Sequence, residues 1–268
     1  MSRSGVSWMQ DWASAWGLTP ENWSPFVGCS PVGDECRNCW ARRLEDGRLR
    51  HLDRCQGQRF WDGPVFQARE GEYIGDREIY RPHHWKKPRA SWCCPSSDPF
   101  HRLIPDDMVA LMLAVMATAD DHHHLFLTKR STRMRRLMTE YELGFTSKQR
   151  SNITAGVSVT SQETAHRIDD LLRTPAVSRM VSVEPMLGPV ELGLCQEAPD
   201  WVIVGCESGA DRRPCQLDWV KTVVAECLVE GVPVYVKQLD IDGRCSTDPD
   251  EWPEWARVQQ IPRRKEAP

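Results

Sequence analysis

The sequence contains no apolar run that approaches the roughly 20 residues of a membrane-spanning helix, so we expect no membrane partner. Residues 1–30 lack the basic start and apolar stretch of a secretory signal. An excess of positive charge is also missing, because 34 basic and 38 acidic residues give a net charge of −4. Any contact with nucleic acid would therefore depend on a local basic patch. These absences predict a cytoplasmic protein.

Apolar, strand-like runs alternate with amphipathic segments along most of the chain. The runs cover 24–29, 92–95, 125–128, 153–159, 180–183, 201–205 and 232–236, and the segments 105–119, 131–143, 161–173 and 217–230 have helical spacing. Strands that are apolar throughout and alternate with helices indicate a parallel sheet covered by helices. We predict a single α/β domain over 23–240, a partial or complete β/α (TIM-like) barrel of about seven units.

The remaining segments are predicted to lie outside the barrel. Residues 1–22 are expected to form a loosely ordered lead-in. Residues 56–90 and 241–268, rich in Gly, Pro and charge, are interpreted as an insertion and a tail.

Polar side chains follow each predicted strand. Examples are Asp98 after the second strand, Lys129 and Arg130 after the third, Glu184 after the fifth and Glu207 after the sixth. A β/α barrel places its active site at the carboxyl ends of its strands. The sequence therefore predicts a site at this edge.

Eleven cysteines is a high count, and their odd number argues against a disulfide scaffold. Cys29, Cys36 and Cys39 have the spacing C-x6-C-x2-C in one turn-forming loop. Three thiolates can hold three irons of a [4Fe–4S] cluster and leave the fourth iron open to a ligand. The alternatives are three ordinary buried cysteines, or a zinc site completed by Cys55 or by a histidine of the run 122–124. That run otherwise indicates a solvated turn before the third strand.

The twelve tryptophans favour packing and loop anchoring over stacking on nucleic-acid bases. A basic run, Lys129 to Arg136 and then Lys148 and Arg150, could reach phosphates at the predicted catalytic edge or could form a charged helix face.

Beyond these patterns, the sequence resembles a phage and bacterial three-cysteine family related to radical-SAM enzymes. The resemblance covers roughly residues 20–240 and is carried by NWSP at 22–25, GC at 28–29, CRNCWA at 36–41, WKKP at 85–88, SDPFH at 97–101, LTKR at 127–130, GVSV at 156–159, SVEPMLGP at 182–189, WVIVGCESG at 201–209 and VKQ at 236–238. Three features depart from the expected pattern: the cysteine spacing differs from the common C-x3-C-x2-C, Cys206 replaces a Gly, and Cys93-Cys94 replaces Val-Asn.

The resemblance implies a radical-SAM-like barrel with a [4Fe–4S] cluster on Cys29, Cys36 and Cys39, S-adenosylmethionine and an external electron donor. In this chemistry the cluster reduces the sulfonium, and the resulting 5′-deoxyadenosyl radical abstracts hydrogen from a substrate. Candidate cofactor contacts are Glu184 and Glu207 for the ammonium or ribose, Lys129 and Arg130 for the carboxylate, and Gly205 and Gly209 for close backbone approach. Asp98 and His101 could contact substrate or carry a proton, or could form a hydrogen-bonded loop pair.

Because the resemblance points to phages, whose DNA often carries elaborate pyrimidine modification, we predict a modified base in DNA as substrate. One form is isomerisation of an amino-acid (glycinyl-type) adduct on a thymine methyl group, with the base flipped from the duplex. The protein would then act in the host cytoplasm. The alternatives are a zinc-binding, nucleic-acid-associated module without catalysis, or a radical-SAM enzyme acting on a free nucleotide or peptide.

Overall fold

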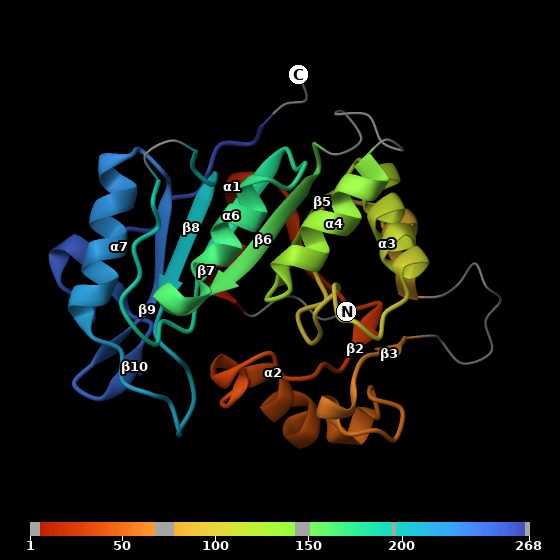
Figure 1. The fold of residues 1–268 in the computed structure, drawn as a ribbon, viewed down its shortest axis with the longest axis horizontal. Coiled ribbons are helices and arrows are strands. Elements are labelled where there is room, and N and C mark those ends of the chain that lie inside the picture. The colour runs from red at the N-terminus through yellow and green to blue at the C-terminus, as the bar shows by residue number, and fades with distance from the viewer. Residues whose placement is uncertain (1–5, 68–77, 143–150, 195–196, 266–268) are drawn as a thin grey trace.

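A curled sheet forms the frame of the protein in the computed structural model, which describes residues 6–67, 78–142, 151–194 and 197–265 (Figure 1). Its strand order is β1-β4-β5-β6-β7-β8-β9-β10. The strands are β1 (Thr19–Trp23), β4 (Arg89–Cys93), β5 (His123–Thr128), β6 (Ile153–Val159), β7 (Ser178–Val183), β8 (Trp201–Gly205), β9 (Val234–Ile241) and β10 (Arg244–Ser246). All neighbours from β1 to β9 pair in parallel, and β10 pairs antiparallel with β9.

This topology confirms the predicted parallel α/β architecture. Within the described residues β1 does not pair with β10, so the sheet is a partial barrel, open at one side. A short separate hairpin, β2 (Phe26–Val27) with β3 (Val65–Phe66), flanks it.

Four helices cover the outer face of the sheet: α3 (Asp106–Thr118), α4 (Ser131–Glu142), α6 (His166–Leu172) and α7 (Leu217–Val229). Their apolar faces join the sheet in one large core, to which α3 contributes Val109, Met112 and Met116. A capping box at the start of the segment 161–173 is formed by Ser161 and Thr164. Among the described residues, no helix has both the length and the apolarity to cross a bilayer.

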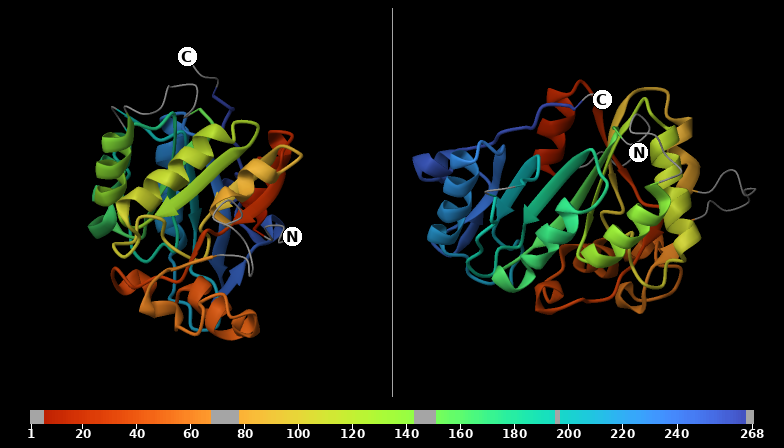
Figure 2. Two further views of the ribbon diagram at one scale, coloured as in Figure 1. Left: turned by 90° about the vertical axis from the view of Figure 1, so that its right-hand side faces the viewer. Right: turned by 45° about the horizontal axis from the view of Figure 1, so that its top comes forward.

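Shorter turns of helix lie mainly in the segment that carries the three cysteines and near the C-terminus. They are η1 (Asp34–Cys36), α2 (Trp40–Arg43), the π-turn η2 (Leu44–Arg48), η3 (Arg50–Leu52), η4 (Phe60–Asp62), η6 (Glu78–His84), η7 (Gln162–Thr164), η8 (Pro249–Glu251) and η9 (Glu254–Ala256). In Figures 1 and 2, the red-to-orange segment with the cysteines lies across the lower end of the sheet, toward which β6 and β7 point.

Helix α1 (Ser7–Ala15) fills the inner face of the curled sheet, on the side away from α3, α4, α6 and α7 (Figure 2). Trp8 is 2% exposed, and its ring centroid lies 5.3 Å from that of Trp92 and 5.7 Å from that of Trp201. Trp12 is equally buried. The prediction of a loosely ordered lead-in over 1–22 is therefore wrong for the described part of that segment.

The first strand also differs from the prediction: β1 occupies Thr19–Trp23, while part of the expected run 24–29 forms β2. Glu21 interrupts the apolar pattern expected of a buried strand. In the structure its carboxylate is buried and pairs with Arg81 at 2.7 Å and Arg89 at 3.6 Å. A buried charge is tolerated in a strand when it is paired in this way.

The described part of the expected tail 241–268, residues 241–265, is also part of the fold. It forms β10, and the 2%-exposed Trp252 donates its indole N–H to Ser246 Oγ at 3.2 Å. The predicted insertion 56–90 contains β3 and η6, and its residues 68–77 lie outside the described residues.

The histidine run 122–124 is buried, so the prediction of a solvated turn is wrong. His123 packs edge-on against Trp12 and Trp16, and His124 hydrogen-bonds to Ser91 at 2.7 Å. Burial lowers the pKa of His124 to about 3, so its imidazole is neutral at physiological pH.

Candidate active site

A cavity of about 330 Å³ opens between the carboxyl ends of the strands and the cysteine-bearing segment. The strand ends supply Asp98, Thr128, Lys129, Arg130, Ser158, Ser182, Glu184, Glu207 and Lys237, and the opposite wall includes Cys29, Ser30, Glu35, Cys36, Asn38, Cys39 and Trp40. Residues from both predicted groups, the cysteines and the strand-end side chains, therefore line the same space. This is the edge at which barrels place their active sites.

The backbone that leads into the cysteine loop packs closely against a neighbouring segment of the chain. Gly28 has φ +94°, and a Cβ there would lie 2.4 Å from the carbonyl oxygen of Gly63, so only glycine fits. The next N–H, that of Cys29, donates to the carbonyl of Phe60 at 2.8 Å. Cys36 ends η1, and Cys39 precedes α2.

Burial disfavours the ionised form of two of the three cysteine thiols. Burial, and secondly the charge of Asp98, raise the pKa of Cys29 to about 12, and burial also raises the pKa of Cys39. Without a cation these sulfurs are protonated thiols, whereas a metal deprotonates them on binding. Within the described residues, no three His, Cys, Asp or Glu side chains already stand in a metal-binding cluster. Cys29, Cys36 and Cys39 thus bring three sulfur donors to one wall of the cavity.

One anchor of the cysteine loop is the ion pair between Glu35 and Arg167 of α6, 2.6 Å long with both side chains 8% exposed. Burial alone would raise the pKa of Glu35, but hydrogen bonding and charge from Arg167 outweigh it, and the pKa is lowered. The guanidinium also donates to the carbonyl of Ser158 at 2.8 Å. The loop is thereby fixed to the end of β6.

A second anchor joins the loop to the segment after β8. Arg213 pairs with Glu207 at 2.6 Å and with Asp34 at 2.8 Å, and Asn38 donates to Glu207 at 2.9 Å. Burial opposes ionisation of Glu207, but the hydrogen bonds from Arg213 and Asn38 lower its pKa. Both carboxylate oxygens are thus occupied by protein donors, so Glu207 holds the loop in place in this conformation.

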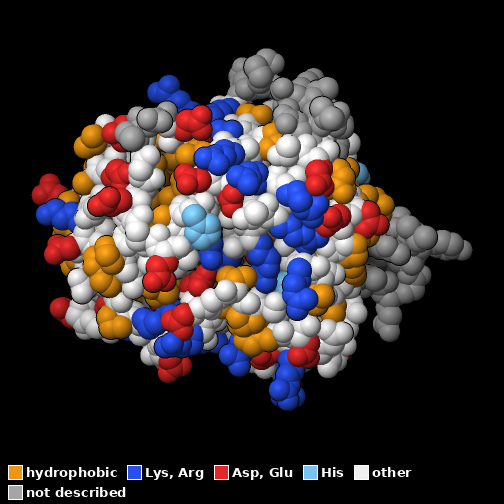
Figure 3. Space-filling model, viewed as in Figure 1, with side chains coloured by type: hydrophobic (Ala, Val, Ile, Leu, Met, Phe, Trp, Pro, Cys, Tyr) orange, Lys and Arg blue, Asp and Glu red, His pale blue; other side chains and the backbone are white. Residues whose placement is uncertain are grey.

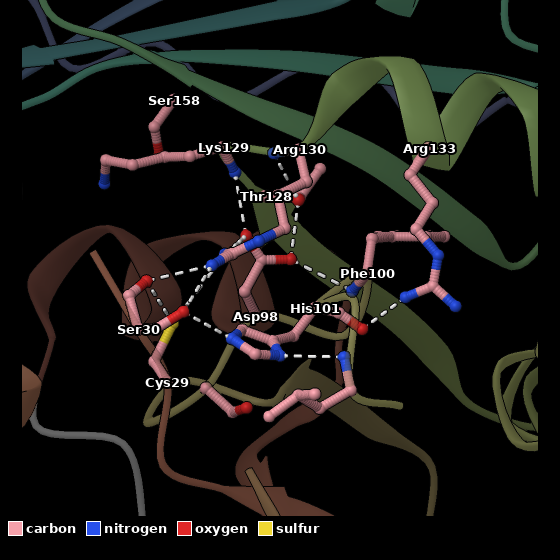
Figure 4. A network of polar contacts seen from close by, with 12 residues as sticks. Cys29, Ser30, Asp98, Phe100, His101, Thr128, Lys129, Arg130, Arg133 and Ser158 are labelled. Carbon is pink, nitrogen blue, oxygen red and sulfur yellow. Dashed lines mark hydrogen bonds and ion pairs between the residues drawn. The ribbon is translucent and has the colours of Figure 1, made fainter. Parts of the chain in front are cut away.

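The third anchor is centred on Asp98 and Arg130 (Figure 4). Asp98 accepts hydrogen bonds from Thr128 Oγ1 at 2.6 Å, from two backbone N–H groups, and from Arg130 at 2.8 Å. Arg130 also donates to the carbonyl of Ser30 at 2.9 Å and approaches Cys29 Sγ at 3.7 Å. A guanidinium held beside Cys29 would stabilise the anionic sulfur of a metal-bound cysteine.

His101 lies behind this network and does not line the cavity. Burial, with Arg130 nearby, lowers its pKa to about 4, so the ring is neutral. Its Nδ1 accepts the N–H of Leu103 at 3.1 Å, which leaves the proton on Nε2 to donate to Ser30 Oγ at 2.6 Å. His101 therefore supports the cysteine loop through Ser30.

Three charged groups remain directed at the cavity. Glu184 and Lys237 form an ion pair across it, with side chains 19% and 20% exposed. The Lys129 ammonium has no hydrogen-bond or ion-pair partner among the described residues (Figure 4). Its charge lowers the pKa of Cys39, although burial dominates there.

The two predicted glycines do not line the cavity. Gly209 has φ +100°, and a Cβ there would lie 2.0 Å from an Arg43 nitrogen, while a Cβ at Gly205 would meet Gln238 at 3.1 Å. In this structure both glycines make room for protein atoms.

The basic side chains of α4 are paired. Arg133 and Arg136 contact Asp106, and Arg135 contacts Asp170 at 3.1 Å. Figure 3 shows Lys and Arg interspersed with Asp and Glu on this face. The arrangement is that of a charged helix face; Lys148 and Arg150 lie outside the described residues.

Sequence reasoning did not assign roles to Ser30, Glu35, Asn38, Arg167, Arg213 and Lys237. Asn38 and Glu35 stand inside the cysteine motif, and Lys237 lies in the last parallel strand, so their positions were a usable signal. Nothing in the sequence pattern distinguishes Arg167 or Arg213 from the other arginines of the chain.

Comparison with known proteins gives a family but no assigned activity. No curated protein and no solved structure matches the chain. One family, described as "Protein of unknown function (DUF5131)", has a model that matches residues 13–248. The match covers most of the chain, and the protein therefore belongs to the DUF5131 family.

Proposed function

We propose that this protein is a radical-SAM enzyme that binds a [4Fe–4S] cluster through Cys29, Cys36 and Cys39. The observation that carries the proposal is the convergence of these cysteines with ionisable strand-end side chains on one cavity. A structural zinc site is normally closed by four protein ligands. Here His122–His124 are engaged at the other end of β5, so they supply no fourth ligand in this structure. Cys55 lies in a small apolar cluster against which Cys29 and Cys39 pack, but among the described residues it completes no group of three or more metal-binding side chains.

When bound, the cluster would supply the electron that cleaves the sulfonium of S-adenosylmethionine. The protein's own part is to hold the cysteine loop and to bind the cofactor. The anchors through Arg130, Arg167 and Arg213 fix the loop against three different strand ends. Arg130 beside Cys29 would offset part of the negative charge of three thiolates.

The pair Glu184–Lys237 is the best match in the cavity for a zwitterionic amino-acid group. Glu184 would exchange its bond with Lys237 for one with the ammonium of S-adenosylmethionine. The ammonium of Lys129, which has no partner among the described residues, would donate to the carboxylate of the cofactor. Ser158 and Ser182 supply neutral polar groups on the same wall. Trp8 and Trp92 close the cavity floor with apolar surface, which limits water near a reactive intermediate.

For the substrate we propose a modified base in DNA, as the sequence resemblance implies. The supporting feature is Trp40, which lines the cavity and is 44% exposed, unlike the buried tryptophans of the core. An exposed indole at a cavity rim offers a stacking surface for an extruded base. On the face shown in Figure 3 the Lys and Arg side chains of the described residues are interspersed with Asp and Glu, so the encounter with duplex DNA would be transient.

The experiment is an anaerobic cleavage assay with reconstituted protein, dithionite and S-adenosylmethionine. We expect 5′-deoxyadenosine and methionine to form, and Glu184→Gln to weaken cofactor binding about 10- to 100-fold because one charge-assisted bond is lost. Glu140→Gln, on the exposed side of α4, is the matched control. No cleavage product from wild-type protein containing about four irons would overturn the proposal. Cleavage without change in any modified phage DNA would overturn the substrate assignment alone.

A further inference from the structure

Two cysteines outside the predicted cluster site approach each other beside the cavity. Cys206 follows β8 and lines the cavity wall, and Cys245 lies on β10. Their sulfurs are 3.7 Å apart although 39 positions separate them in the sequence. We propose that Cys206 and Cys245 form a redox-active dithiol that is oxidised to a disulfide by low-molecular-weight disulfides.

The backbone holds both cysteines against the same strand, β9. The N–H of Cys206 donates to the carbonyl of Gln238 at 3.2 Å, and the Gln238 side chain donates back to the carbonyl of Cys206 at 2.6 Å. Cys245 is the register partner of Asp240 in the β9–β10 pair. Since β9 fixes both positions, the two thiols are held side by side with their sulfurs 3.7 Å apart.

The surroundings make Cys245 the nucleophile and Cys206 the resolving thiol. Cys245 is partly exposed, whereas Cys206 is fully buried. The S–H of Cys206 donates to Cys245, and Lys237 and Arg212 add positive charge; together they lower the pKa of Cys245 against the opposing effects of burial and Glu184. A thiolate that is accessible and near cations is the reactive form of cysteine.

The other close pair, Cys93 and Cys94, lacks these properties. Their sulfurs are 3.6 Å apart, but both side chains are buried, and burial raises the pKa of Cys93. The distance alone therefore does not distinguish the two pairs; exposure and local charge do.

The reaction proceeds in two exchanges. The Cys245 thiolate attacks one sulfur of a small disulfide, which forms a mixed disulfide and releases one thiolate. Cys206, after giving up its proton, then attacks the Cys245 sulfur and releases the second thiolate. The two protein thiols lose two electrons, and the small disulfide gains them. The product links the cavity wall to β10.

The test treats reduced, full-length protein with glutathione disulfide, followed by alkylation and peptide mapping. We expect a Cys206–Cys245 linked peptide in the wild type and in the control Cys227→Ser, which changes a buried cysteine of α7. In Cys206→Ser the mixed disulfide should accumulate on Cys245, because the resolving thiol is absent. In Cys245→Ser, Cys206 should stay unmodified.

A second measurement is the rate of alkylation by iodoacetamide at neutral pH, for which we expect Cys245 to react at least about tenfold faster than Cys227. Absence of the linked peptide in folded wild-type protein, or equal alkylation rates, would overturn the proposal. The mapping needs no iron and no S-adenosylmethionine, so the result is independent of the proposed radical-SAM function.

Discussion

Arg130→Ala is expected to destabilise the protein by about 3 kcal/mol, because removal of one partner of a buried ion pair leaves the other charge uncompensated. The Asp98 side chain is 8% exposed and that of Arg130 15%. Asp98 keeps its bonds from Thr128 and two backbone N–H groups, which places the expected loss at the lower end of the range for broken buried pairs. The carbonyl of Ser30 also loses its donor, so the cysteine loop is loosened. Urea unfolding measures the change.

The matched control for this prediction is Arg136→Ala. Arg136 pairs with Asp106 and Glu140, but its side chain is 47% exposed, and such surface pairs contribute little to stability. We expect its unfolding midpoint to equal that of the wild type. Equal losses in the two variants would show that the Asp98–Arg130 pair is not buried as described.

Trp8→Ala is expected to cost about 3–5 kcal/mol, the range for removal of a fully buried large aromatic side chain. Trp8 fills the inner face of the half-barrel between Trp92 and Trp201, so its loss opens a cavity beneath the candidate active site. The midpoint of urea unfolding again reports the effect.

Trp40→Ala removes the same side chain from a position that is 44% exposed. Because most of its surface already faces solvent, we expect a clearly smaller change in stability. If Trp8→Ala unfolded at the wild-type midpoint, helix α1 would not be docked inside the sheet.

The parts of the fold that could be predicted are those in which local pattern and tertiary environment agree. The runs 153–159 and 201–205 coincide with β6 and β8, because both strands are buried at every position and therefore carry no charged residue. Strand β1 could not be found in this way. Its Glu21 is compatible with burial only because Arg81, 60 positions away, neutralises it. Helix α1 was missed because its buried stripe is short and precedes the first recognisable strand.

The candidate site shows the same division. Strand-end reasoning found Asp98, Lys129, Glu184 and Glu207, all of which line the cavity, because parallel strands end at a common edge. It could not tell which of them are occupied by protein donors. Glu207 is held by Arg213 from a loop without a recognisable motif, whereas Glu184 pairs with Lys237 alone among the residues that the structure describes. That difference depends on three-dimensional contacts between side chains distant in sequence.

The most direct test of the central claim is the iron and sulfide content after anaerobic reconstitution, with electron paramagnetic resonance of the reduced protein before and after S-adenosylmethionine. We predict about four irons per chain, their loss when Cys29, Cys36 and Cys39 are replaced by Ala, and a spectrum that changes when the cofactor is added. Retention of iron in Cys227→Ala would confirm that the loss is specific. One zinc per chain without iron, or a cluster whose spectrum does not change when S-adenosylmethionine is added, would contradict the claim and indicate a metal-stabilised binding protein.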